Sequence, residues 1–146
     1  KNEAVKQAYL FSCFCGLRIS DIISLKWKDV FVDRGQYRLA VSMQKTKEPI
    51  YLPLSPEALK WMPRKSKDSE RVFHQLRITS TTVEVVLGEW MQEAGIQKHI
   101  TYHCSRHTAA TMLLTLGASI YVVSKILGHK SIKTTQIYAS APRMVA

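Results

Sequence analysis

Residues 103–128 read HCSRHTAATMLLTLGASIYVVSKILG, and this stretch decides the fold that the sequence predicts. Apolar residues recur at helical spacing over 105–117 and again over 119–128. Each segment ends in a glycine, at Gly117 and at Gly128, where a helix favours a residue that accepts a left-handed backbone. Ser119 is suited to cap the second segment. The stretch therefore predicts two consecutive helices joined by a short turn.

The segments on either side extend this helical half. Residues 131–139, SIKTTQIYA, begin with a serine that can cap a further helix. Residues 81–95, TTVEVVLGEWMQEAG, have helical spacing and precede the opening stretch. From residue 80 to residue 139 we expect helices only.

The first half of the chain is mixed. Residues 3–15 predict a helix that Gly16 ends, and residues 19–27 predict a second helix that Ser20 and Asp21 can cap. Residues 30–42 and 49–54 are rich in β-formers and alternate in polarity. Turns are expected at 34–35 and 44–48, a helix start at 55–57 and a solvated loop at 63–70. The prediction is one mainly helical α+β domain over residues 1–146, with a small three-stranded antiparallel sheet.

The net charge limits the classes of partner. The 146 residues contain 21 Lys and Arg against 11 Asp and Glu, which gives a formal charge of +10. Such an excess favours an anionic partner, with nucleic acid first and an acidic membrane surface second. No apolar run is long enough to cross a bilayer and no signal peptide is visible, so we expect no membrane insertion. The three cysteines, an odd and sparse set, indicate reduced thiols in a cytoplasmic setting.

The densest polar cluster is residues 103–107, HCSRH. If Arg106 lies in the first turn of a helix, its guanidinium and the free N–H groups of that turn suit a phosphate. His103 can reach the same anion from the preceding turn. The alternative is an ordinary helix start with incidental basic residues.

Three further clusters are candidates for chemistry. His129 follows the turn glycine Gly128, and Tyr138 lies nine residues later; each could equally be a structural or surface residue. Arg18 follows Gly16, and Asp21 can hold it in place, although a surface ion pair would look the same. Lys45 falls on the expected hairpin turn, where a lysine is ordinarily a solvated charge.

The order of these clusters resembles the catalytic domains of the tyrosine recombinases, or phage integrase family. The matching elements, from about residue 3 to residue 140, are GLRISD at 16–21, Lys45 before YLPL, HCSRH at 103–107, LGH at 127–129 and TQIY at 135–138. Three positions depart from the usual pattern: Cys15 replaces a common Thr, Ser105 a common Leu and Asp21 a common Glu. None of these changes removes a catalytic functional group.

The resemblance implies a mechanism and a role for each residue. Tyr138 attacks a DNA phosphate and forms a 3′-phosphotyrosine bond that a 5′-hydroxyl later reverses, without metal or cofactor. The residues that would act on the phosphate and its protons are Arg18, Arg106, His129, His103 as the base for Tyr138 and Lys45 as the general acid. Asp21 would orient Arg18, and His107 would support the helix start.

The resemblance also implies partners. Double-stranded DNA is the expected substrate, in a homotetramer on two duplexes, whereas we expect the free chain to be a monomer. An N-terminal DNA-clamping domain is expected outside this chain, which starts at Lys1 and would be an excised piece of a cytoplasmic, nucleoid-associated protein from a bacterium or phage. The target sequence, and whether the system is a mobile element or a resolution system, stay open. We also expect the helix carrying Tyr138 to be mobile without DNA.

Three other interpretations remain at this point. A metal site could use His103, Cys104 and His107 with the cysteines at 13 and 15, although the usual zinc spacing is absent. A non-catalytic DNA-binding module would explain the charge but not the filled catalytic positions. A type IB topoisomerase uses the same chemistry but reseals the strand to itself.

Overall fold

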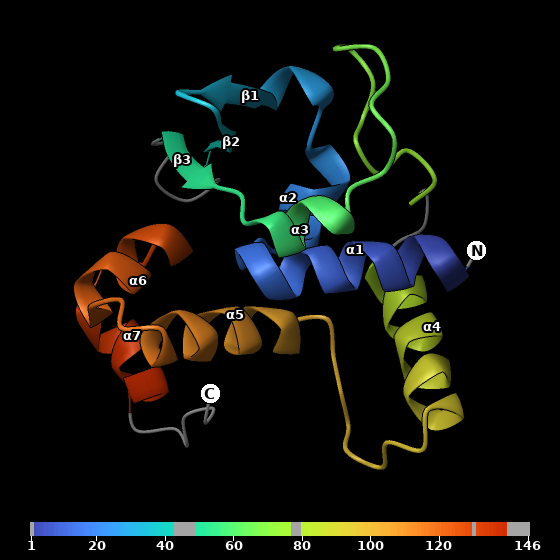
Figure 1. The fold of residues 1–146 in the computed structure, drawn as a ribbon. Coiled ribbons are helices and arrows are strands. Elements are labelled where there is room, and N and C mark those ends of the chain that lie inside the picture. The colour runs from blue at the N-terminus through green and yellow to red at the C-terminus, as the bar shows by residue number, and fades with distance from the viewer. Residues whose placement is uncertain (1, 43–48, 77–79, 130, 140–146) are drawn as a thin grey trace.

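A computed structural model describes residues 2–42, 49–76, 80–129 and 131–139 of the chain (Figure 1). Side chains are not described at 2, 50, 80, 81, 138 and 139. The elements are α1 (Asn2–Cys15), α2 (Ile19–Ser24), the 3₁₀ helix η1 (Trp27–Asp29), β1 (Val30–Asp33), β2 (Gln36–Ser42), β3 (Pro49–Pro53), α3 (Pro56–Lys60), α4 (Ser80–Glu93), α5 (Cys104–Thr115), α6 (Ile120–Leu127) and α7 (Ile132–Ala139). The predicted class, mainly helical with a small sheet, is confirmed.

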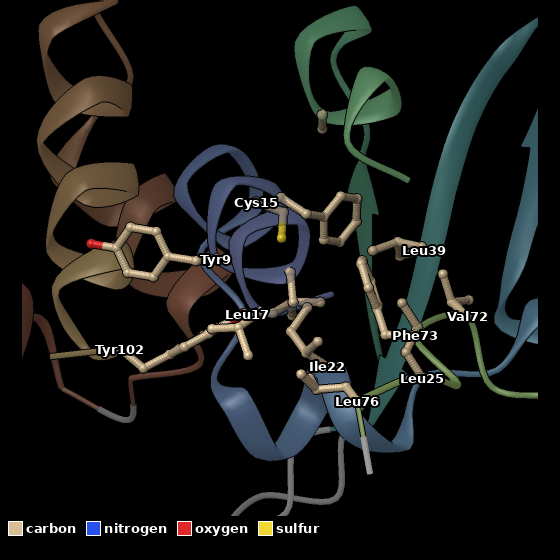
Figure 2. Close-up of a cluster of buried hydrophobic side chains, with 14 of the residues drawn as sticks. Tyr9, Cys15, Leu17, Ile22, Leu25, Leu39, Val72, Phe73, Leu76 and Tyr102 are labelled. Atoms are coloured by element: carbon tan, nitrogen blue, oxygen red, sulfur yellow. The ribbon is translucent and has the colours of Figure 1, made fainter. Parts of the chain in front are cut away.

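Helix α1 is the centre of the core. It contacts α3, α4 and α5, and the sheet lies on the side of α1 opposite α5 (Figure 1). Its buried positions Val5, Ala8 and Phe11 follow the helical repeat. Figure 2 shows Cys15 in the same cluster of buried apolar side chains as Phe73 and Leu39, which come from the loop after α3 and from β2. The core therefore joins the sheet to the helical half of the chain through α1.

The sheet has the predicted three antiparallel strands, in the order β1-β2-β3. The predicted turn at 34–35 is confirmed: Arg34 and Gly35 have φ of 53° and 78°. Two successive positive φ values are typical of a tight hairpin whose twist matches that of the strands. The second predicted turn, residues 44–48, lies outside the described residues.

The helix predicted over 19–27 is shorter than expected. Helix α2 ends at Ser24, and its N-cap residue is Arg18 rather than Ser20 or Asp21. The reason is pairing with a distant segment. Trp27 N–H donates to the carbonyl of Glu70, and Val72 N–H donates to the carbonyl of Leu25. Because the Trp27 N–H and the Leu25 carbonyl bond to residues 70 and 72, they do not take part in helical hydrogen bonds, and α2 ends before residue 25.

The predicted helix ends are confirmed at the glycines. Gly117 and Gly128 have φ of 97° and 71°. Gly117 follows Leu116, the C-cap residue of α5, and Gly128 directly follows α6. The Ser119 hydroxyl accepts the N–H of Val122 at the start of α6. Helices α6 and α7 pack together and both contact α5 at its far end from α4 (Figure 1). Across the described residues, no helix has both the length and the apolar character needed to cross a membrane.

Candidate active site

Arg106 lies in the first turn of α5, as predicted, and only 3% of its surface is exposed. Its Nη1 donates to the carbonyl of Gly16 at 2.7 Å, and its Nη2 donates to the carbonyl of Leu127. These carbonyls belong to the C-terminal turns of α1 and α6, where the helix dipoles concentrate negative charge. Arg106 on α5 is thus held by two other segments, the ends of α1 and α6, which lie 90 and 21 residues from it in the sequence.

The predicted free N–H groups in the first turn of α5 are not there. Cys104, Ser105 and Arg106 donate their N–H groups at 3.0 Å to the carbonyls of residues 101, 102 and 103. A tight turn ahead of the helix therefore satisfies the donors that a helix start usually leaves open. That part of the prediction was wrong, because these N–H groups already have carbonyl partners. An anion at this helix end would therefore be attracted by the charge of side chains and not by main-chain N–H groups.

The turn before α5 is held by Ser12, Glu84 and Tyr102, which the sequence did not single out, together with Ser105. The Tyr102 and Ser12 hydroxyls share a buried hydrogen bond of 2.7 Å. The Glu84 carboxylate accepts the N–H of Tyr102 at 2.9 and 3.1 Å. Ser105, at 1% exposure, donates its hydroxyl to the carbonyl of Tyr102 at 2.8 Å. Because these contacts join α1, α4 and α5, no local sequence pattern could have revealed them.

His129 lies in the turn that ends α6. Its N–H donates to the carbonyl of Ser124, and the N–H of Gly128 donates to that of Lys125, which together form a complete glycine-based helix cap. The His129 Nδ1 and the Thr135 Oγ1 on α7 lie 2.6 Å apart. The left-handed glycine and this bond fix both the backbone and the ring of His129.

Arg18 and Asp21 lie together at the start of α2. The buried Asp21 carboxylate accepts the main-chain N–H of Arg18 at 3.2 Å. The recorded bond orients the backbone of Arg18 rather than pairing with its guanidinium, which refines the predicted contact. A carboxylate at the third helical position that reaches back in this way is half of a capping box.

Electrostatics place the two arginines and the two histidines in one neighbourhood. Partial burial lowers the pKa of His103, and the charges of His107, Arg106 and Arg18 lower it further. Burial also lowers the pKa of His129, followed by the charges of Arg106, Arg18 and His103. The His103 and His107 rings meet edge to face with centroids 4.9 Å apart. His103 and His129, whose pKa values are lowered, are therefore held in their neutral form at neutral pH.

Two predicted residues stand apart from this description. Lys45 lies outside the described residues. Tyr138 belongs to the last turn of α7, three residues after Thr135, and its side chain lies outside the described part. The described site therefore contains Arg18, His103, Arg106, His107 and His129, with Asp21 behind Arg18.

Residues 3–143 match the phage integrase family. The chain belongs to this family. It is 33% identical over 136 residues to the tyrosine recombinase XerD of Lacticaseibacillus casei, and 34% identical over 131 residues to the tyrosine recombinase XerA of Pyrococcus furiosus. Each alignment covers 84% of the chain and 45% of the relative, so the chain spans about half the length of these relatives.

Solved structures agree with the assignment to the phage integrase family. The chain is 25% identical to a crystal structure of XerA recombinase, with a TM-score of 0.69 over 97% of this chain and 60% of that one. A XerH site-specific recombinase bound to its difH substrate gives a TM-score of 0.72 at 18% identity, over 96% and 44% of the two chains. The second likeness concerns the fold alone.

Two of the departures from the usual family sequence are now explained by packing. Cys15 faces the apolar core at 7% exposure, and burial raises the pKa of its thiol to about 12. Ser105 is equally enclosed and has its hydrogen bond to Tyr102. Neither residue exposes a reactive group.

The alternative of a metal site gains no support from this geometry. Burial raises the pKa of the Cys13 thiol to about 11, whereas a zinc ligand must be a thiolate. Among the residues that the structure describes, no three histidine, cysteine or carboxylate side chains come together in a way that could hold a metal ion.

Proposed function

We propose that this chain is the catalytic part of a site-specific tyrosine recombinase, and that it cuts and rejoins DNA through a 3′-phosphotyrosine intermediate. The observation that carries the proposal is that Arg106 donates to the carbonyls of Gly16 and Leu127, which lie two residues before Arg18 and two residues before His129. These contacts bring the segments of Arg18, Arg106, His103 and His129 together, in agreement with the lowered pKa values of the two histidines. These residues come from the starts of α2 and α5 and from the turn after α6, and α7 with Tyr138 packs against α5 and α6.

The arginines suit the charge of the reaction. A phosphate under attack gains negative charge on its non-bridging oxygens, and guanidinium groups can bind those oxygens with paired hydrogen bonds. Arginine keeps its charge at every working pH. Arg18 and Arg106 would therefore supply the stabilisation that a divalent cation provides in other phosphoryl-transfer enzymes.

The histidines suit the proton transfers. A phenol has a pKa of about 10, so Tyr138 must give up its proton when its oxygen attacks phosphorus. His103 is neutral at neutral pH because its pKa is lowered, and it can accept this proton. As the new Tyr138–phosphorus bond forms, the bond from phosphorus to the 5′-oxygen breaks. His129 would donate a hydrogen bond to a non-bridging oxygen, and His107 would support the start of α5 beside His103.

Lys45 is the proposed general acid that protonates the leaving 5′-oxygen. Replacement by alanine should slow cleavage of a normal phosphodiester far more than cleavage of a 5′-bridging phosphorothiolate, because sulfur leaves without protonation. Single-turnover cleavage of the two substrates by Lys45→Ala and by the unaltered protein measures the difference. Equal losses on both substrates would remove Lys45 from this role.

The nucleophile is tested by trapping the covalent adduct. Cells expressing the whole parent protein are lysed in denaturant, and protein-linked DNA is captured and sequenced, which also reports the unknown target. The same adduct is then formed in vitro on a nicked duplex of that sequence in EDTA. We expect a denaturant-resistant adduct that Tyr138→Phe abolishes.

The matched control is Tyr121→Phe, which removes the hydroxyl of an exposed tyrosine on α6. It should form the adduct as the unaltered protein does. No adduct from any variant, despite salt-sensitive DNA binding, would favour a non-catalytic DNA-binding module. An adduct that reseals only to its own strand would favour a topoisomerase.

The proposal extends to the biological setting. The substrate would be double-stranded DNA, recombined by a homotetramer on two duplexes, with a monomeric free chain. Integration or excision of a mobile element in a bacterial or phage system, in the cytoplasm at the nucleoid, is the role that we propose. The family membership and the charge of +10 support the DNA partner.

A further inference from the structure

Thr135 has an unusual position on α7. Its exposure is 0%, and it is the only buried residue among the α7 side chains that the structure describes. The neighbouring Lys133, Thr134 and Gln136 are exposed, and Ile137 is 59% exposed. A polar residue, and not an apolar one, thus makes the innermost described contact of this helix.

The contact that Thr135 makes is with the ring of His129. The Oγ1 lies 2.6 Å from Nδ1, which is a short hydrogen bond. The distance alone does not say which atom donates. A buried hydroxyl needs an acceptor for its proton, and Nδ1 is the partner given for this hydroxyl, so we assign Nδ1 as the acceptor. When Nδ1 accepts a hydrogen bond, the proton of a neutral imidazole resides on Nε2.

We propose that Thr135 is a positioning residue that fixes His129 as the Nε2–H tautomer and ties the helix carrying Tyr138 to the turn carrying His129. The catalytic consequence rests on the proposed function, since a neutral histidine can donate a hydrogen bond to a phosphate oxygen only from the nitrogen that bears its proton. The Thr135 hydroxyl fixes the tautomer of His129 without adding charge to the site.

The surroundings of His129 explain why a residue is needed to fix its tautomer. Besides its burial, the ring is faced by Arg106 and His103 at the start of α5 and by Arg18 at the start of α2. These positive groups disfavour the imidazolium, so the ring is neutral and has two tautomers to choose between. Without a partner for Nδ1, either nitrogen could hold the proton.

The coupling to Tyr138 follows from the helix. Thr135 and Tyr138 are three residues apart in α7, within one helical turn. The His129–Thr135 bond therefore restrains the backbone that carries Tyr138. One hydrogen bond links the proposed phosphate contact of His129 to the position of the proposed nucleophile.

The experiment compares Thr135→Val, which keeps the shape but removes the hydroxyl, with Thr135→Ser, which restores it. Thr134→Val is the matched control, because it makes the same change at an exposed adjacent position. Nitrogen-15 NMR of the histidine rings, with His129 assigned from the spectrum of His129→Gln, reads the tautomer without DNA. We expect Nε2–H in the unaltered protein, in Thr135→Ser and in Thr134→Val, and a mixture of tautomers in Thr135→Val.

The kinetic readout is single-turnover adduct formation by the whole protein on its trapped target. Thr135→Val should lower the cleavage rate by about tenfold or more with little change in DNA affinity, and Thr135→Ser should recover most of that rate. An unchanged tautomer in Thr135→Val, or a rate that Ser does not recover, would overturn the proposal. Because the NMR readout needs no DNA, absence of an adduct in the unaltered protein would contradict the proposed function alone.

Discussion

Arg106 and Arg18 change the acid–base behaviour of the histidines beside them. Each arginine lowers the pKa of His103 and of His129, in addition to the effect of burial. The proposed site would have to accept a proton at neutral pH, and this arrangement suits that role, since His103 and His129 stay neutral while the arginines stay charged. The same charges also make folding sensitive to pH.

We predict that the protein loses stability as the pH falls below about 6.5, the ordinary pKa of histidine. The folded pKa values of His103 and His129 lie below that of the unfolded chain, so the unfolded state takes up protons first. The free energy of unfolding should therefore decrease from about pH 6.5 down through the two folded pKa values. Above that range both states are neutral, and these residues add no pH dependence.

Urea unfolding between about pH 7.5 and about pH 5 measures this slope. The double variant His103→Gln/His129→Gln should show a shallower fall in stability than the unaltered protein. Other titrating groups contribute equally to both proteins, so the difference isolates the two histidines. Identical slopes would show that these side chains are not held neutral by the fold.

At the scale of the element, two glycines should respond to the same substitution with opposite signs. Gly16 has φ of 78°, and an added Cβ would lie 3.2 Å from Leu127 Cδ2 and 3.4 Å from Ala109 Cβ. Gly16→Ala should lower the free energy of unfolding by about 1–2 kcal/mol through backbone strain and crowding. Gly88, inside α4, has no atom within 4 Å of such a Cβ, so Gly88→Ala should raise stability by about 0.5–1 kcal/mol.

Thermal or urea unfolding of both variants measures this difference. Since the substitution is the same, Gly88→Ala is the control for any general effect of alanine on the protein. A gain of stability at Gly16 would mean that its left-handed conformation is not needed. The carbonyl of Gly16 also accepts a hydrogen bond from Arg106. Backbone strain at residue 16 in Gly16→Ala should therefore reduce adduct formation as well.

Helix α7 should open more readily than the other helix of equal length. Helices α6 and α7 each have eight residues, which is marginal for an isolated helix. Helix α6 buries Val123, Ser124 and Leu127, whereas Thr135 is the buried residue among the described side chains of α7. Hydrogen exchange in the absence of DNA should be about tenfold or more faster in α7 than in α6. Equal protection would contradict the expected mobility of the helix that carries Tyr138.

The elements were predictable from the sequence where the signals are local. Gly117, Gly128 and Ser119 set helix ends through their own backbone or side-chain preferences, and the turn at 34–35 did the same for the first hairpin. The helix expected over 19–27 was too long because its last residues pair with the main chain near residue 70. A helix end that is decided by a partner about 45 residues away leaves no trace in the local pattern.

The residues of the candidate site were proposed from the sequence, but the contacts that hold them in place could not be predicted from it. Charge, spacing and the resemblance singled out Arg18, Arg106 and His129. They could not reveal Glu84 behind the turn before α5, or Thr135 behind His129, because these contacts are tertiary. The expectation of open main-chain donors at α5 failed for the same reason, since the turn before the helix uses them.

At the scale of the whole molecule, the charge of +10 predicts DNA binding that weakens with salt. Each phosphate that the protein neutralises releases bound counterions, and the affinity falls by a constant power of the salt concentration. If two to five phosphates are neutralised, raising the salt from about 50 to about 200 mM should lower the affinity roughly 10- to 500-fold. Fluorescence anisotropy of the whole protein on a labelled duplex gives this slope, and salt-independent binding would rule out a charge-driven interface.

The two carbonyls that hold Arg106 also determine when the site can exist during folding. One lies 90 residues away along the chain and the other 21 residues away. Contacts between such distant positions require large loops to close, so they form late and are among the slower steps of folding. In a nascent or partly unfolded chain, the helices would form before the guanidinium of Arg106 had bound its two carbonyl partners. In the proposed function, completion of the fold would therefore act as a safeguard, because the charge of Arg106 reaches its position only once the C-terminal turns of α1 and α6 have packed against α5.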